Sequence, residues 1–211
     1  MNELLTHALT VFLAFFAIMN PIANTPIFIG LTVDDDRATR KQVALRSVGL
    51  AFVIVFCFCV LGKAIFELFG ISLPAFRIAG GALVSLVGFQ MLHGEQSRIH
   101  SPSDKENINA REAALSVAIS PLAMPILAGP GTIATAMNYS ATGKLPEIVI
   151  TIITFAVLCI ITYVFFVFGH GLVKFIGKNG IKVVTRLMGL ILAVIGTQMV
   201  IQGIHGAMRL F

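Results

Sequence analysis

Six long segments with almost no charged residues are the feature that most constrains how this chain can fold. A helix that crosses the hydrocarbon core of a bilayer, about 30 Å thick, needs about 20 mostly apolar residues. Such segments make up most of the 211 residues, of which 57% are hydrophobic and 12% are charged. The sequence therefore predicts an all-α integral membrane protein with six transmembrane helices, near residues 4–33, 47–62, 75–92, 113–143, 148–169 and 184–204.

Two of these segments are too long to be single straight helices. Residues 4–33 and 113–143 run for 30 and 31 residues without Asp, Glu, Lys or Arg, which would make each helix about 45 Å long. Proline removes a backbone donor and disfavours the helical conformation of the residue before it. We therefore expect unwound backbone at the prolines of both segments. These are Pro21 and Pro26 in the first segment and Pro121, Pro125 and Pro130 in the second.

The two halves of the chain contain matching motifs. Arg77-Ile78-Ala79-Gly80 and Gly88-Phe89-Gln90-Met91 are echoed by Arg186-Leu187-Met188-Gly189 and Gly196-Thr197-Gln198-Met199. Three spans in each half would make the second half enter the membrane from the opposite side. We predict a first three-helix repeat over 1–92, a cytoplasmic linker over 93–111 and an inverted three-helix repeat over 112–211, with helices 1 and 4 broken at their Pro/Gly motifs.

The basic residues of the predicted loops favour one orientation. Ten of them fall on one side of the membrane and three on the other, and cytoplasmic loops carry the excess of Lys and Arg. The sequence thus predicts that both termini are periplasmic. The ten residues are Arg37, Arg40, Lys41, Arg46, Arg98, Lys105, Arg111, Lys174, Lys178 and Lys182, and the three are Lys63, Lys144 and Arg209.

Several other classes of function are disfavoured. The net charge of +5 comes from short loops between apolar segments, so we expect no nucleic-acid partner. The three cysteines and five histidines lack the spacing of a metal site or disulfide framework, so we expect no metal and no cofactor. No Asp lies in a predicted span, and the His-Glu-x-x-His and Gly-x-Ser-x-Gly motifs are missing, which argues against an enzyme.

The two interrupted segments are the candidate binding site. Broken helices persist at membrane depth where protein or a water-filled cavity satisfies their backbone groups, and inverted repeats bring two such breaks together. Half-helix N-termini would then attract a carboxylate, and exposed carbonyls an ammonium group. The alternative is that the prolines only shape the helices, since they are frequent in membrane spans. The predicted substrate-binding residues are Asn20, Pro21, Asn24, Thr25, Ser120, Pro121, Gly129, Gly131 and Thr132.

Four further polar residues within the spans are candidates for the repeat interface or for gating. Arg77 and Arg186 lie near predicted helix ends, where a long side chain can reach polar groups. They could lock the interface through carbonyl contacts or contact substrate. Gln90 and Gln198 are more typical of hydrogen bonds between helices.

Several motifs carry a family resemblance. Asn20-Pro21, Ser120-Pro121, Gly129-Pro130-Gly131 and the block Phe76-Arg77-Ile78-Ala79-Gly80-Gly81 resemble the MarC family of bacterial inner-membrane proteins over nearly the whole chain. The resemblance implies a six-helix protein of the plasma membrane. It also implies membership of a group of neutral amino-acid transporters, in which an archaeal relative moves glycine and alanine.

The leading hypothesis is a secondary transporter of small neutral amino acids of the glycine, alanine and serine class, working by alternating access. A passive channel, or an exporter of another small metabolite or drug, is the alternative. The coupling ion could be sodium on backbone carbonyls or a proton on an interfacial group, or transport could be uncoupled. The Phe-rich second and fifth spans could pack against membrane lipid or against a second copy of the chain in a homo-oligomer.

Overall fold

The computed structural model describes residues 2–33, 35–94, 127–140 and 144–209. Within these ranges the secondary structure is helical, with no strand. The helices are α1 (Asn2–Met19), α2 (Pro21–Leu31), α3 (Arg37–Phe69), α4 (Leu73–His93), α6 (Pro130–Ser140) and α7 (Leu145–Met208).

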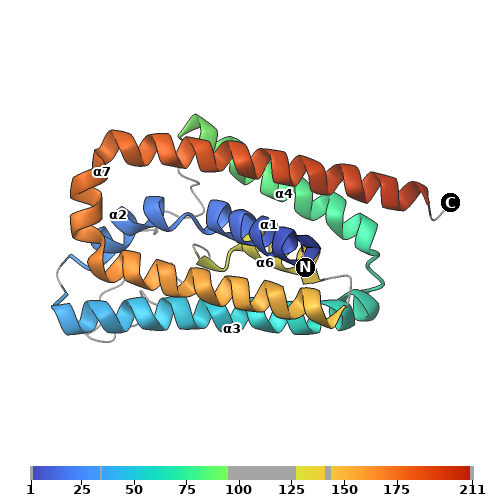
Figure 1. The fold of residues 1–211 in the computed structure, drawn as a ribbon, viewed down its shortest axis with the longest axis horizontal. Coiled ribbons are helices and arrows are strands. Elements are labelled where there is room, and N and C mark those ends of the chain that lie inside the picture. The colour runs from blue at the N-terminus through green and yellow to red at the C-terminus, as the bar shows by residue number, and fades with distance from the viewer. Residues whose placement is uncertain (1, 34, 95–126, 141–143, 210–211) are drawn as a thin grey trace.

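The long helices lie side by side along one axis of the molecule (Figure 1). Helix α7 doubles back on itself between Gly169 and Asn179 (Figure 1). Within this turn Gly177 has a φ of 68° and a ψ of 165°, which are not helical and suit a residue without a Cβ. The reversal divides α7 into two membrane-length parts, Leu145–Gly169 and Asn179–Met208. The start of α1 and the end of α7 both lie toward the right of Figure 1.

Five candidate membrane spans are present in the described part of the chain. Besides the two parts of α7, they are Leu4–Leu31, Arg37–Phe69 and Leu73–His93. Each corresponds to one of the six segments expected from hydropathy, and together they are consistent with an α-helical membrane protein. Much of the expected fourth span, 113–143, lies outside the described residues, and α6 is the described part of it.

Helix α3 is longer than its predicted apolar segment. The Asp36 side chain accepts a hydrogen bond from the Thr39 N–H at 3.0 Å, which caps the helix within the charged loop. At the other end, Gly70 adopts the left-handed conformation with φ of 64°, which stops the helix. Because charged residues beyond both membrane boundaries are good helix formers, hydropathy alone underestimated this helix.

The first break is smaller than predicted. Helices α1 and α2 are separated by Asn20 alone, and α2 continues through Pro26. The expectation of unwound backbone from Pro21 to Pro26 is therefore wrong. Pro21 occupies the first turn of α2, where no N–H is required. Pro26 lies inside α2, next to Thr25, which packs against Gly169 of α7.

Helix α4 and the second part of α7 pack through a reciprocal pair of glycine contacts. A Cβ built on Gly81 would lie 2.6 Å from the Gly196 carbonyl oxygen, and one built on Gly196 would lie 2.5 Å from the Gly81 carbonyl oxygen. Gly88 and Gly189 repeat the relationship at 2.6 and 2.7 Å. The two helices are therefore antiparallel and approach backbone to backbone, as small residues permit in membranes.

Candidate functional site

Asn20 holds an unusual backbone conformation at the junction of α1 and α2. Its φ of 37° and ψ of 69° are left-handed, and among the described residues it is the one non-glycine with a positive φ. Asparagine tolerates this region better than most residues because its short amide can bond locally.

Two asparagine side chains replace a main-chain hydrogen bond at the break. In an uninterrupted helix the Ala23 N–H would donate to the Met19 carbonyl. Instead, the Ala23 N–H donates to Asn20 Oδ1 at 3.2 Å, and Asn24 Nδ2 donates to the Met19 carbonyl at 2.6 Å. The break is thus satisfied largely from within the chain, by two of the residues that the sequence predicted for the site.

One donor at the break has no partner among the described residues. Asn20 is 3% exposed, and its Nδ2 is buried without a hydrogen bond to that part of the chain. The Oδ1 atom must face the Ala23 N–H, so the NH₂ group points the other way. An unsatisfied buried donor of this kind costs about 1–3 kcal/mol, which makes it a candidate ligand-binding group.

Thr25 has a local structural role. Its hydroxyl donates to the Pro21 carbonyl at 2.6 Å, and its methyl group packs directly against Gly169 of α7. Thr25 is fully buried. It therefore anchors α2 against α7 close to the break.

The second interruption is described from Leu127 onward. Helix α6 begins at Pro130, and the Ile133 N–H donates to the Gly129 carbonyl at 3.0 Å. The N–H groups of Gly131 and Thr132 belong to the first turn, where helix geometry supplies no acceptor. Thr132 is 2% exposed. Ser120 and Pro121, which the sequence also predicted, lie outside the described residues.

The two interruptions lie next to each other. A Cβ built on Gly131 would lie 2.5 Å from Cδ1 of Ile18, and Ile18 precedes Asn20 by two residues. Met19 and Leu127 also share one buried apolar cluster. The start of α6 therefore packs against the end of α1, which brings Asn20, Gly131 and Thr132 to the same region of the bundle.

The residues predicted for the repeat interface have different environments. Arg186 and Gln198 are exposed on α7. A guanidinium nitrogen of Arg186 lies near Gly94, which follows the last residue of α4, at 4.0 Å from the position that a Cβ on Gly94 would take. The Oε1 atom of Gln90 is buried and has no hydrogen-bond partner within the ranges that the structure describes.

Arg77 joins α4 to α6. Its Nε donates to Asn138 Oδ1 at 2.9 Å, and Asn138 is 6% exposed. Asn138 is not among the residues predicted from the sequence. A polar side chain eight residues after Pro130 in an uncharged segment was the available signal.

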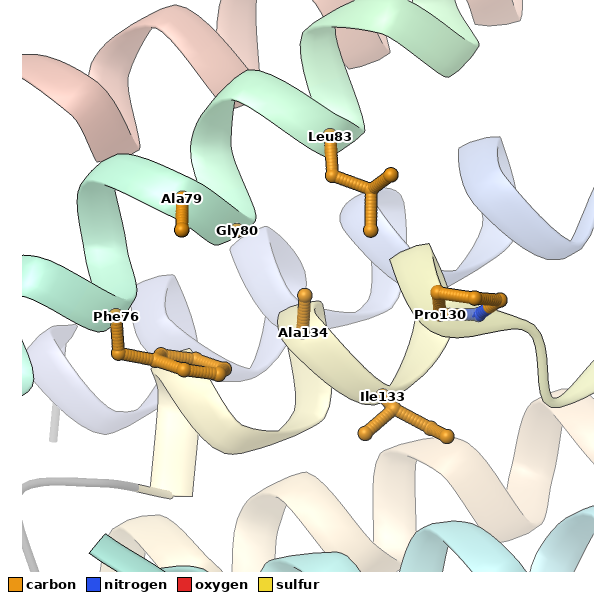
Figure 2. Close-up of a pocket in the computed structure, with 7 residues that line it drawn as sticks. All are labelled: Phe76, Ala79, Gly80, Leu83, Pro130, Ile133 and Ala134. Carbon is orange, nitrogen blue, oxygen red and sulfur yellow. The ribbon is translucent and has the colours of Figure 1, made fainter. Parts of the chain in front are cut away.

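An apolar recess lies between α4 and α6 (Figure 2). Its volume is ≈ 370 Å³. No polar side chain lines it within the described part of the chain, so its walls alone could hold only apolar groups. The lining residues are Phe76, Ala79, Gly80, Leu83, Pro130, Ile133 and Ala134.

Comparison with known proteins identifies the family. The model of the MarC family of integral membrane proteins matches residues 5–208. The chain is 38% identical over 197 residues to the UPF0056 membrane protein YvbG of Bacillus subtilis, covering 93% of each chain. It is 34% identical over 194 residues to the UPF0056 inner membrane protein MarC of Salmonella typhimurium, covering 88% of each. No solved structure shows a significant match. The chain therefore belongs to the MarC family of integral membrane proteins.

Proposed function

We propose that this protein is a secondary transporter of small neutral amino acids, with its central binding site between the two interrupted helices. The observation that carries the proposal is the contact of Ile18 with Gly131, which sets the break at Asn20 against the first turn of α6. An amino acid in its zwitterionic form carries an anionic and a cationic group on the same carbon atom, and opposed helix breaks suit both groups.

The carboxylate would bind at the start of α6. The first-turn N–H groups of Gly131 and Thr132 and the positive end of the helix dipole favour an anion. The unpartnered Nδ2 of Asn20 adds a neutral donor on the other side of the junction. Glycine at 131 permits the close packing of α6 against the end of α1, because a side chain there would occupy the space of Ile18.

The ammonium group would bind carbonyl oxygens of the first break. Pro21 has no N–H to give to the carbonyl of Ala17, its partner in an uninterrupted helix. Ser120 and Pro121 are proposed to complete the site as the second half's counterparts of Asn20 and Pro21. Because Ser120 and Asn20 differ, the two half-sites would contact the substrate differently.

The reciprocal glycine contacts support two inverted repeats of three helices. Gly81 opposes Gly196 and Gly88 opposes Gly189. The contacts make Gly81 and Gly189 counterparts, one residue along from the motif match of Gly80 with Gly189, and they make Gly88 and Gly196 counterparts as in the motifs. A pseudo-two-fold axis between the helices would then exchange one contact for the other, as inverted repeats require. Alternating access would then tilt one repeat against the other.

The proposal includes an orientation and a location. We place the protein in the cytoplasmic membrane with both termini outside, because ten basic loop residues would then lie in the cytoplasm against three outside. One relative is named as an inner membrane protein, in keeping with that location.

Transport by purified protein in liposomes tests the proposal. Labelled alanine, glycine or serine should enter the vesicles saturably, and unlabelled substrate inside should accelerate entry by exchange. N20G should lose most of this transport because it removes Nδ2, whereas T197A, which alters an exposed hydroxyl bonded to its own helix, should not. A protein that moves none of a broad panel of amino acids would refute the proposal, and uptake without exchange would favour a channel.

A further inference from the structure

Arg77 is a cation within a membrane span whose hydrogen-bond partner is neutral. Asn138 accepts from its Nε at 2.9 Å, and Arg77 is half-buried. The two ion pairs in the described part of the chain are Lys63 with Glu67 and Lys144 with Glu147. The Asn138 amide therefore orients the guanidinium without neutralising it.

The dipole of helix α4 does not offset the positive charge of Arg77. Arg77 lies five residues after the N-cap Ser72, nearer the positive end of the helix dipole, where acidic groups are favoured over basic ones. A guanidinium presents parallel N–H groups that match the two oxygens of a carboxylate. An uncompensated arginine inside a span is thus a candidate for an anionic ligand.

Arg77 is next in sequence to Phe76, one of the residues that line the recess between α4 and α6. Gly80 faces Ala134 across this interface, where a Cβ on Gly80 would be 3.3 Å from the Ala134 Cβ. Three residues earlier on α4 is Arg77, and four residues later on α6 is Asn138. The Arg77 and Asn138 hydrogen bond therefore comes one helical turn beyond the Gly80 and Ala134 contact. Phe76, the neighbour of Arg77 in sequence, is labelled in Figure 2.

We propose that Arg77 binds the carboxylate of the transported amino acid at an outer entry site, with the aliphatic part of the substrate in the apolar recess. Asn138 is seven residues beyond Gly131 on α6, about 10 Å by helix rise. A small amino acid cannot span that distance, so the outer site and the central site hold it in succession. This inference rests on the proposed transport function and adds the first contact of the substrate.

The test compares R77Q with wild type in proteoliposomes that take up labelled alanine. Losing a charge-assisted pair should raise the half-saturating alanine concentration by about tenfold or more, with a smaller change in maximal rate. R46Q, which removes an exposed arginine on α3, is the matched control and should leave both values unchanged. R77K keeps the positive charge but lacks the paired N–H groups of a guanidinium. Its half-saturating alanine concentration should fall between those of wild type and R77Q.

A second measurement uses the wild-type protein and does not depend on a variant folding. Phenylglyoxal should modify Arg77, as read by peptide mass spectrometry, and alanine should protect it while alaninamide, which lacks the carboxylate, should not. Equal protection by both compounds, or by neither, overturns the inference.

The two proposals fail in distinguishable ways. Wild-type protein that transports no amino acid overturns the transport function and this inference together. Wild-type protein that transports alanine while R77Q retains its half-saturation value overturns the inference alone. If R77Q instead loses a co-purified anionic phospholipid with unchanged alanine uptake, the guanidinium binds lipid phosphate and the inference is wrong.

Discussion

Gly81 and Gly196 face each other so closely that neither could carry a side chain without meeting the carbonyl oxygen of the other. The contact is between backbones, which side-chain rotation cannot relieve. It fixes how α4 and the second part of α7 cross.

Replacing Gly81 by alanine should therefore destabilise the protein. The new Cβ would lie 2.6 Å from the Gly196 oxygen and 2.9 Å from the Met199 Cβ, and overpacking of this kind costs about 1–3 kcal/mol. Thermal unfolding in detergent would measure the loss. G49A is the control, because nothing lies within 4 Å of a Cβ there; a G81A protein as stable as G49A would contradict the prediction.

Substitutions of Asn20 should separate its backbone role from its amide. N20A loses the cap to the Ala23 N–H and places alanine in the left-handed region, at a combined cost of about 2 kcal/mol. N20G loses the cap but tolerates the conformation, so it should be the more stable variant in thermal unfolding. N20A equal to or above N20G in stability would refute the assigned conformation.

G131A should impair transport more than stability. Its Cβ would meet the flexible end of Ile18 at 2.5 Å, which can move at small cost, but that movement displaces the end of α1 from the start of α6. Alanine uptake should fall severalfold, and the double variant G131A/I18V, with a shorter side chain at 18, should recover part of it. Unfolding measurements on the same samples provide the control.

Gly169 and Thr25 should be energetically coupled. A Cβ on Gly169 would overlap the Thr25 methyl group, so G169A should cost about 1–3 kcal/mol. T25S removes that methyl and keeps a hydroxyl for the Pro21 carbonyl. In the double variant the two changes should show a favourable coupling of about 1 kcal/mol, measured by a double-mutant cycle; additive effects would count against this packing.

Cysteine labelling checks the orientation. Arg37 at the start of α3 and Lys144 before α7 are both exposed and should lie on opposite sides of the membrane. After replacement of Cys57, Cys59 and Cys159 by alanine, a membrane-impermeant maleimide on intact cells should label K144C and spare R37C. The reverse pattern would invert the proposed topology.

Hydropathy and proline positions predicted much of this fold because both act locally. Five of the six expected spans and a break beside Pro21 are present in the described residues. The extent of the break was not predictable from the prolines, since it depends on amides at Asn20 and Asn24 that bond the freed backbone. The bond from Arg77 to Asn138 crosses 61 residues of sequence, and no local pattern encodes such a pairing.

The side-chain hydrogen bonds that replace a main-chain bond at Asn20 also matter for the protein with no ligand bound. A carrier that works in one direction must return empty after each delivery. If substrate alone satisfied the backbone groups at the break between α1 and α2, its release would leave those groups without hydrogen bonds inside the membrane. The return of the empty carrier would then be energetically unfavourable. Because the side chains of Asn20 and Asn24 bond the Ala23 N–H and the Met19 carbonyl, the break is satisfied with nothing bound. Under the proposed transport function, the Nδ2 group of Asn20 would then be available for the next substrate molecule.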